Sequence, residues 1–188
     1  MEALLTSFIA AGLAEWGDKT QLLVIALATR FGRPGPVLAG VAVAALANAL
    51  IAAAGGIVVH GFVVIRALTL LLGLALVCAG VGGLIRRRAP SLPERLRVGP
   101  FATAAVLFFI AELGDKTQFL TFAISARFDS MLLAAAGACA GVIAACAPAA
   151  LLGGALPRQV PVRAIRLGAA ILFLLSGFAA GVAALGLV

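Results

Sequence analysis

Charged side chains are scarce in this 188-residue sequence, where they make up 11% of the residues and only 7 are acidic. Tyrosine is absent, and tryptophan and histidine occur once each. Hydrophobic residues reach 64% and the mean hydropathy is +1.21. A soluble domain has about 25% charged residues, and one of this size still exposes roughly a third of its unfolded surface. The composition therefore excludes a soluble enzyme and a disordered chain, and it leaves an integral membrane protein.

Neither a nucleic-acid interface nor a disulfide framework is indicated. The formal net charge is +7, but the basic residues stand at the ends of apolar runs, where they anchor membrane helices. No basic stripe is interleaved with aromatic residues. The three cysteines, Cys78, Cys139 and Cys146, lie inside apolar runs without CxxC spacing. We interpret them as small buried residues rather than as disulfide partners or zinc ligands.

Six apolar runs are long enough to cross a bilayer, which takes about 20 residues. The expected fold class is therefore all-α integral membrane, with six transmembrane helices. The first run has no basic n-region and contains two acids, so we interpret it as a mature helix rather than a signal peptide. The runs are Ala3–Ala28, Pro36–Val59, Val64–Ile85, Phe101–Ala126, Met131–Ala155 and Ala164–Leu187.

Arginine predicts the orientation in the membrane. The loops between helices 1 and 2, 3 and 4, and 5 and 6 hold most of the arginines, whereas the opposite side holds Arg66 and Arg127. The positive-inside rule places the arginine-rich loops in the cytoplasm and both termini outside. We interpret the Arg86–Arg97 loop as a topology anchor, with an anionic-lipid site as the alternative. The arginines on the cytoplasmic side are Arg30, Arg33, Arg86, Arg87, Arg88, Arg95, Arg97, Arg158, Arg163 and Arg166.

A ten-residue segment occurs twice in the chain. Ala14–Leu23 matches Ala111–Leu120 at eight of ten positions, with a constant offset of 97 that also relates Gly40 to Gly137. A match of this length indicates a duplication. We predict two repeats of three helices each, residues 1–98 and 99–188. Because three is odd, the second repeat is expected to be inverted, as in secondary transporters that bind substrate near the membrane midplane.

Each copy of the segment places two acids about halfway along an apolar run: Glu15 with Asp18, and Glu112 with Asp115. An acid at that depth costs at least ~2.5–3.5 kcal/mol on insertion scales and indicates a functional site. The i, i+3 spacing puts each pair on one helix face. The two pairs could form a four-carboxylate cage. Its auxiliary residues would be Gln21, Gln118, Thr20, Thr117, Lys19, Lys116 and Asn48.

Two glycines and two lysines within the segment leave alternatives open. Gly17 and Gly114 permit either a close helix approach or a local break that frees backbone carbonyls. Lys19 and Lys116 stand four residues after the glutamates, in the order that favours an ion pair. The lysines could lock the carboxylates, bond backbone carbonyls or compete with a metal. A purely structural role for the whole segment is a further alternative, disfavoured by its occurring twice.

A cage of four carboxylates needs neutralising partners. Two like charges about 4 Å apart repel by ~4 kcal/mol at an effective dielectric of 20, so the site must take up a cation or protons. Oxygen ligands suit Ca²⁺, Mn²⁺ or Mg²⁺, and Mg²⁺ comes third because it sheds water reluctantly. No cysteine, histidine or methionine is near the segment in the sequence, which disfavours Zn²⁺ and Cu⁺.

Three further residues have simple structural interpretations. His60 stands at the end of an apolar run and is interpreted as an interfacial loop residue rather than a proton relay. Trp16 is replaced by Leu113 in the second copy, which indicates packing. Asn48 corresponds to Ala145 in the second repeat, so it is either a helix-packing amide or a ligand.

The doubled E-x-G-D-K-T motif, within six apolar runs, resembles the Gdt-type family of cation/proton exchangers. The resemblance covers nearly the whole chain, and both motifs are intact. It implies transport of Mn²⁺ or Ca²⁺ in exchange for protons, with Glu15, Asp18, Glu112 and Asp115 as cation ligands. The absence of the N-terminal extension of organellar members and the short central loop point to a bacterial plasma-membrane protein. In bacterial relatives the implied role is manganese export.

The sequence therefore predicts an antiporter that exports Mn²⁺ for H⁺ by alternating access. It would need no cofactor and would not be an enzyme. Its partners would be the lipid bilayer and the transported cation, and its glycine-rich helix faces permit a homo-oligomer. The alternatives are an exporter of an organic cation or amino acid, a non-transporting scaffold or lipid-binding protein, and a passive cation channel.

Overall fold

The computed structural model describes residues 1–85 and 99–186. Within these ranges the regular secondary structure is helical, and no strand occurs. The Arg86–Arg97 loop lies outside the described residues. In the first half the helices are α1 (Glu2–Glu15), α2 (Lys19–Phe31), α3 (Pro34–His60) and α4 (Ile65–Leu84). In the second half they are α5 (Pro100–Glu112), α6 (Lys116–Phe128), α7 (Met131–Leu152), a short 3-10 helix η1 (Gly153–Ala155), α8 (Leu156–Gln159) and α9 (Val162–Leu185).

Four helical segments within the described ranges are long and apolar enough to cross a membrane. They are α3, α4, α9 and the stretch Met131–Gln159 that contains α7, with mean hydropathies between 2.0 and 2.3. Each corresponds to one of the expected apolar runs. The chain is therefore a multi-pass membrane protein. The short α8, where the sequence analysis expected only a loop around Pro157, extends the α7 segment.

The other two expected helices, over Ala3–Ala28 and Phe101–Ala126, are not continuous. The first is divided between α1 and α2, and the second between α5 and α6. Gly17 and Gly114 stand in the breaks with φ angles of 72° and 71°. A right-handed helix cannot continue through a left-handed residue, and only glycine adopts that conformation without steric cost. Of the two alternatives for these glycines, the structure has the local break.

Helices of one half of the chain pack directly against helices of the other half. Helix α1 packs against α7, and its counterpart α5 packs against α3. Both contacts are very close, because a Cβ atom at Gly137 would lie 2.2 Å from the Leu4 carbonyl and one at Gly40 would lie 2.3 Å from the Phe101 carbonyl. The offset of 97 relates these two contacts to each other. Glycine therefore lets the backbones of the two halves approach in the same way twice.

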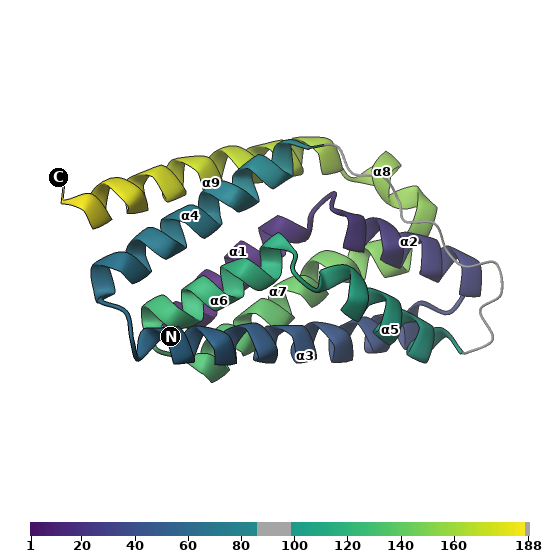
Figure 1. The fold of residues 1–188 in the computed structure, drawn as a ribbon. Coiled ribbons are helices and arrows are strands. Elements are labelled where there is room, and N and C mark those ends of the chain that lie inside the picture. Colours follow the sequence, from purple (N-terminus) through teal and green to yellow (C-terminus); the bar gives the residue numbers. More distant parts are fainter. Residues whose placement is uncertain (86–98, 187–188) are drawn as a thin grey trace.

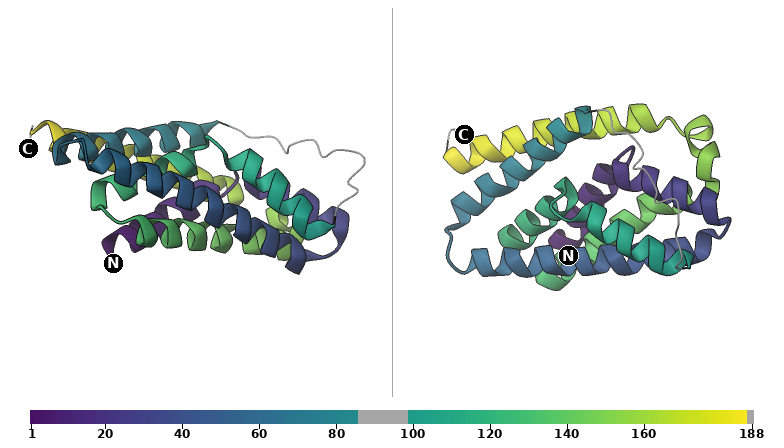
Figure 2. Two further views of the ribbon diagram at one scale, coloured as in Figure 1. Left: turned by 60° about the horizontal axis from the view of Figure 1, so that its bottom comes forward. Right: turned by 45° about the vertical axis from the view of Figure 1, so that its right-hand side comes forward.

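Helices α4 and α9 form a separate pair along one edge of the molecule, and they lie side by side in Figure 1 and in the right-hand view of Figure 2. This pair also depends on related glycines: Gly80 faces the Ala170 carbonyl, and Gly177 faces the Gly73 carbonyl. The remaining helices surround the two breaks. The breaks thus lie among α1, α2, α5, α6, α3 and α7, and Gly17 in the first break also faces Val162 and Arg166 of α9.

The α1–α2 and α5–α6 segments run in opposite directions (Figure 1). Both chain termini and the α3–α4 and α6–α7 connections lie at one end of the molecule, whereas the α2–α3 connection and α8 lie at the other (Figure 1). The described arginines Arg30, Arg33, Arg158 and Arg163 belong to the second end. This grouping is what the sequence analysis expected of the loops; which end faces the cytoplasm is taken up as a proposal below.

Candidate functional site

The two helix breaks are closed by the same local hydrogen bond. The Gly17 N–H donates to Gln21 Oε1 at 2.9 Å, and the Gly114 N–H donates to Gln118 Oε1 at 2.7 Å. In each case a glutamine side chain accepts a backbone N–H at the point where the helix is interrupted. The acids Asp18 and Asp115 follow as the N-cap residues of α2 and α6, with extended backbones. The repeated motif therefore folds into the same local structure twice.

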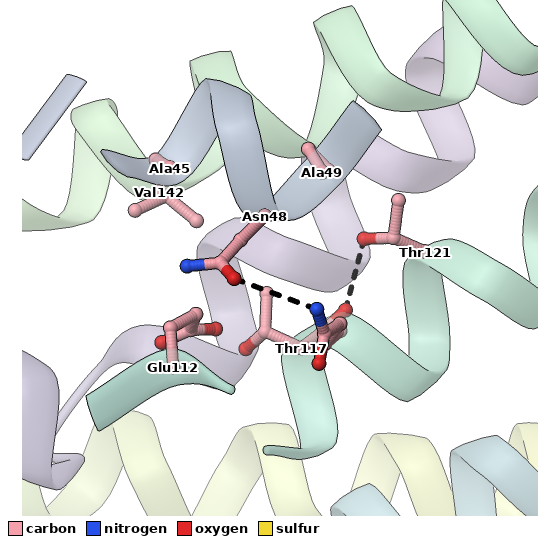
Figure 3. A pocket seen from close by; sticks show the side chains of 9 residues that line it. Ala45, Asn48, Ala49, Glu112, Thr117, Thr121 and Val142 are labelled. Carbon is pink, nitrogen blue, oxygen red and sulfur yellow. Dashed lines mark hydrogen bonds between the residues drawn. The ribbon is translucent and has the colours of Figure 1, made fainter. Parts of the chain in front are cut away.

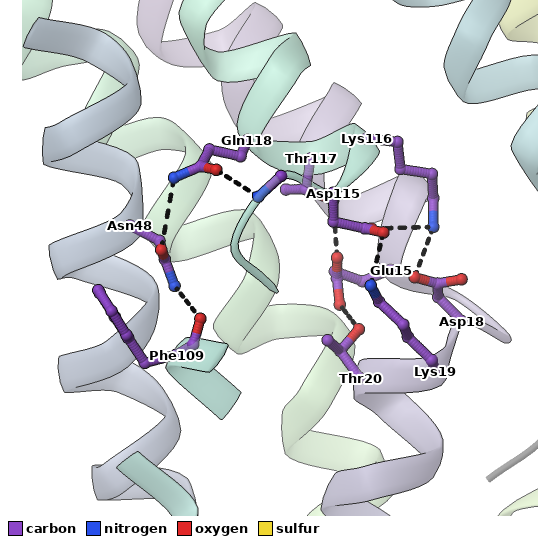
Figure 4. A network of polar contacts seen from close by, with 11 residues as sticks. Glu15, Asp18, Lys19, Thr20, Asn48, Phe109, Asp115, Lys116, Thr117 and Gln118 are labelled. Atoms are coloured by element: carbon purple, nitrogen blue, oxygen red, sulfur yellow. Dashed lines mark hydrogen bonds and ion pairs between the residues drawn. The ribbon is translucent and has the colours of Figure 1, made fainter. Parts of the chain in front are cut away.

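The lysines pair across the two motifs rather than with the glutamates of their own motif (Figure 4). Lys19 Nζ lies 2.9 Å from Asp115 Oδ1, and Lys116 Nζ lies 2.7 Å from Asp18 Oδ2. Lys116 is also 3.7 Å from Asp115 Oδ2. Of the roles left open by the sequence, the structure shows the lysines holding carboxylates, and the carboxylates are those of the aspartates. The crossed pairs tie the two breaks together.

Glu15 is fully buried and both of its carboxylate oxygens accept hydrogen bonds from threonines. The Thr20 hydroxyl donates to Oε2, in a short hydrogen bond. The Thr117 hydroxyl, 102 residues away in sequence, donates to Oε1 at 2.7 Å. The threonines that the sequence analysis offered as auxiliary cation ligands thus both bond one glutamate.

Glu112, the counterpart of Glu15, is 2% exposed, and within the described ranges neither of its carboxylate oxygens has a hydrogen-bond partner. It faces a small pocket of about 10 Å³, lined also by Asn48, Gln118 and Thr121 (Figure 3). A buried polar group without a partner costs about 1–3 kcal/mol, and more when it is charged. This carboxylate is therefore available to a ligand.

The remaining amides of the site connect the motifs to the long helices. Gln118 Nε2 donates to Asn48 Oδ1 at 3.4 Å, and Asn48 Nδ2 donates to the Phe109 carbonyl at 3.2 Å. In the other half, Gln21 Nε2 donates to the Ala145 carbonyl at 2.9 Å. Ala145 is the counterpart of Asn48, so each glutamine bonds the same position of the opposite half. Asn48 is thus a bridging amide whose oxygen is shared with Gln118.

The four motif acids come from both halves into one region, where the charges of Glu15, Asp18 and Asp115 all act on Glu112. In the conformation described, the lysines occupy the space between the aspartates. Across residues 1–85 and 99–186, no three Asp, Glu, His or Cys side chains are arranged to hold a metal ion. The convergence of the four acids on a transported cation is accordingly a proposal, taken up below.

Sequence reasoning did not place Cys146 beside the site. This residue is fully buried on α7, directly after Ala145, whose carbonyl accepts the hydrogen bond from Gln21. The sequence analysis counted no cysteine near the motifs, because in the linear sequence none is close. The helical periodicity that places Cys146 four residues after the pocket residue Val142 was the available signal.

Two residues that the sequence analysis interpreted as structural, His60 and Trp16, lie away from the glutamates. His60 is the last residue of α3, where its Nδ1 lies 2.7 Å from the Ala126 carbonyl and its Nε2 lies 3.7 Å from Asp129. Trp16 is the C-cap residue of α1, at the start of the first break. Neither residue is brought to Glu15 or Glu112.

Comparison with known proteins agrees with the motif. The sequence profile of the family described as "Divalent cation/proton antiporter GDT1" matches residues 3–91 and 100–186. A Vibrio cholerae serotype O1 protein named "Putative manganese exporter" is 34% identical over 180 residues, which are 95% of this chain and 90% of that protein. No solved structure matches the chain.

These matches extend over nearly the whole chain and include both motifs. The family is one of transporters and not of enzymes, in agreement with the sequence analysis. Its substrates are divalent cations and protons, as the resemblance implied. The chain belongs to the GDT1 family of divalent cation/proton antiporters.

Proposed function

We propose that this protein exports Mn²⁺ from the bacterial cytoplasm in exchange for protons, with Glu15, Asp18, Glu112 and Asp115 as the cation ligands. The name of the Vibrio cholerae relative supports manganese as the substrate and export as the direction. Oxygen ligands accept Ca²⁺ equally well, so Ca²⁺ is the second candidate substrate. The neutral oxygens of Asn48, Gln118 and Thr121 would complete the coordination.

The observation that carries the proposal is the charge balance of the site. Lys19 and Lys116 neutralise Asp115 and Asp18 through the crossed ion pairs. In the part of the chain that the structure describes, Glu15 and Glu112 have no ion pair of their own. Two ionised glutamates carry a combined charge opposite to that of one divalent cation. The site therefore matches one M²⁺, or the protons that replace it.

The mechanism we propose is alternating access by two inverted three-helix halves, residues 1–98 and 99–188. The opposite directions of α1–α2 and α5–α6 support this arrangement (Figure 1), as do the related contacts of Gly40 and Gly137. Discontinuous helices at the substrate site are typical of secondary transporters. Each half would then rock around the paired breaks, exposing the glutamates to one side of the membrane at a time.

The membrane we propose is the bacterial plasma membrane, with the arginine-rich end in the cytoplasm and both termini outside. In this orientation an inward proton gradient would drive cations outward. Exchange of one divalent cation for two protons would move no net charge across the membrane. Such a cycle would respond to the pH gradient and not to the membrane potential.

Flux measurements in proteoliposomes test the proposal directly. With purified protein and an imposed pH gradient, we expect Mn²⁺ movement that stops when the gradient is abolished and in Glu15→Gln and Glu112→Gln. The matched control is Glu2→Gln, which removes an exposed carboxylate at the start of α1 and should leave flux unchanged. The absence of Mn²⁺ flux in the wild type under any gradient would overturn the proposal.

The same preparation separates the alternatives. A passive channel predicts Mn²⁺ flux that is independent of the pH gradient. An exporter of an organic cation or amino acid predicts flux of that solute with competition by Mn²⁺. A scaffold predicts that the glutamate variants are indistinguishable from the wild type in cells challenged with manganese.

A further inference from the structure

The two glutamates of the site differ most in their hydrogen bonds to two threonine hydroxyl groups. Thr20 and Thr117 occupy the same position in the two motifs, five residues after Glu15 and Glu112. Local symmetry would have each threonine bond the glutamate of its own motif. Instead both hydroxyls donate to Glu15, one to each carboxylate oxygen. Glu112 has neither, and within the described ranges no other hydrogen-bond partner.

This inequality changes what each glutamate can bind. A cation must reach the lone pairs of a carboxylate, and on Glu15 each oxygen already has one of its lone pairs taken by a hydroxyl. The oxygens of Glu112 are aimed into the pocket beside Asn48 (Figure 3) and are unoccupied by any donor in the described part of the chain. In this conformation Glu112 can accept a cation directly, whereas Glu15 is bonded by the two hydroxyls.

The pockets beside the two breaks also differ, and the polar residues of the second motif are the more accessible ones. A larger pocket of about 520 Å³ reaches the second motif and is lined by Gly114, Asp115 and Gln118. The pocket beside the first motif, of about 620 Å³, touches Gly17 but is not lined by Asp18 or Gln21. The second motif is therefore open at its polar residues, and the first is closed at the same positions.

We propose that Thr20 and Thr117 are positioning residues that bond one glutamate at a time, and that the conformational exchange moves both hydroxyls from Glu15 to Glu112. The exchange is available because the halves are related: Thr117 stands to Glu112 as Thr20 stands to Glu15. The glutamate without hydroxyls is the first of the two to meet the incoming cation. The inference rests on the alternating-access mechanism proposed above, and it assigns the threonines a role other than cation ligand.

Two cysteine reporters test the exchange without transport. Ala52 on α3 is 5% exposed and lines the open pocket, whereas its counterpart Ala149 on α7 is fully buried and lines neither pocket beside the motifs. We would replace Cys78, Cys139 and Cys146, introduce Ala52→Cys or Ala149→Cys, and measure modification by a hydrophilic methanethiosulfonate in detergent without divalent cations. In this background Ala52→Cys should react faster than Ala149→Cys.

Glutamine at either glutamate should then shift the two reporters in opposite directions. A neutral acceptor forms hydrogen bonds roughly half as strong as a carboxylate. Glu15→Gln should therefore release the hydroxyls to Glu112, raising the Ala149→Cys rate relative to the Ala52→Cys rate by about tenfold. Glu112→Gln should lower the same ratio. An unfolded variant would raise both modification rates together. If Glu15→Gln does not fold, the proposal is tested by Glu112→Gln, in which the ratio of the Ala149→Cys rate to the Ala52→Cys rate should fall.

The threonines decide whether the shifts arise from the proposed exchange. In the double variant Thr20→Val/Thr117→Val the opposite shifts should disappear, and Thr20→Ser/Thr117→Ser should restore them. Shifts of equal sign for the two glutamine variants, or opposite shifts that persist without the hydroxyls, would overturn the proposal. Because the assay contains neither cation nor pH gradient, its result is independent of whether Mn²⁺ is the substrate.

Discussion

The two copies of the ten-residue segment differ at two positions, Trp16/Leu113 and Leu22/Phe119, yet their glutamates differ in hydrogen bonding and their aspartates in access to a pocket. In the first copy, Glu15 is sealed and bonded by two threonines. In the second, Glu112 has no partner within the described ranges, and a pocket reaches Asp115. The local structure is nevertheless the same, since each break is closed by its own glutamine. Like sequences therefore fold into like breaks, whereas the packing between the halves sets which break has a pocket at its polar residues.

The crossed ion pairs should show the largest difference between the halves. Lys116 is 8% exposed and bonds the buried Asp18, whereas Lys19 is 32% exposed. Removing one partner of a buried pair costs about 3–5 kcal/mol, and exposed pairs contribute about 1 kcal/mol or less. We expect Lys116→Met to lower the thermal stability of the detergent-solubilised protein much more than Lys19→Met. Equal losses would show that the two pairs are energetically equivalent.

The second-largest difference is expected in the contribution of the two glutamates to Mn²⁺ affinity. With Glu15 bonded and Glu112 free, Glu112→Gln should weaken Mn²⁺ binding by at least about 100-fold, since loss of even an outer partner costs 10–100-fold. Glu15→Gln should weaken it less. Electron paramagnetic resonance of free Mn²⁺ would measure both affinities, with Glu2→Gln as the control. A greater loss in Glu15→Gln would reverse the assignment of the open site.

The glycine contacts test where the halves are alike. A Cβ atom would lie 2.3 Å from the Phe101 carbonyl in Gly40→Ala and 2.2 Å from the Leu4 carbonyl in Gly137→Ala. We expect each variant to lose about 1–3 kcal/mol of stability, as overpacked cores do. Gly168→Ala is the matched control, because nothing lies within 4 Å of that position. Thermal unfolding should give similar losses for Gly40→Ala and Gly137→Ala and none for the control.

The smallest expected difference concerns the glycines in the breaks. Alanine at φ angles of 72° and 71° costs about 1–2 kcal/mol at either position. A Cβ at Gly17 would also lie 3.1 Å from Arg166 Cδ, whereas one at Gly114 meets nothing within 4 Å. Gly17→Ala should therefore be somewhat less stable than Gly114→Ala. Gly114→Asn should recover part of the loss, because asparagine tolerates the left-handed conformation.

Much of the fold could be read from the chain. Four expected apolar runs became the long helices, because about 20 consecutive apolar residues have few other stable arrangements in a bilayer. The breaks at Gly17 and Gly114 were only one of two alternatives. Both close approach and a left-handed turn require glycine, and the sequence does not distinguish them. Gly40 and Gly137 took the first role, and Gly17 and Gly114 took the second.

The candidate site was less predictable. The i, i+4 order suggested that each lysine would pair with its own glutamate, but the break after Glu15 and Glu112 removes the helical geometry on which that spacing depends. The lysines could then reach the aspartates of the opposite half. Likewise, no local rule could place Cys146 beside the first motif, because the link runs between halves: Gln21 bonds the carbonyl of Ala145, the residue before Cys146.

The sequence by itself determined that this is a membrane protein, and that two copies of one acidic motif lie about halfway along related apolar segments. Those conclusions depend on composition, run length and repetition, which are local properties. Only the tertiary structure decided that the lysines cross to the aspartates, that both threonines bond Glu15 and that Glu112 stays open. These features depend on how one half packs against the other, and two nearly identical motifs cannot specify which of them is closed.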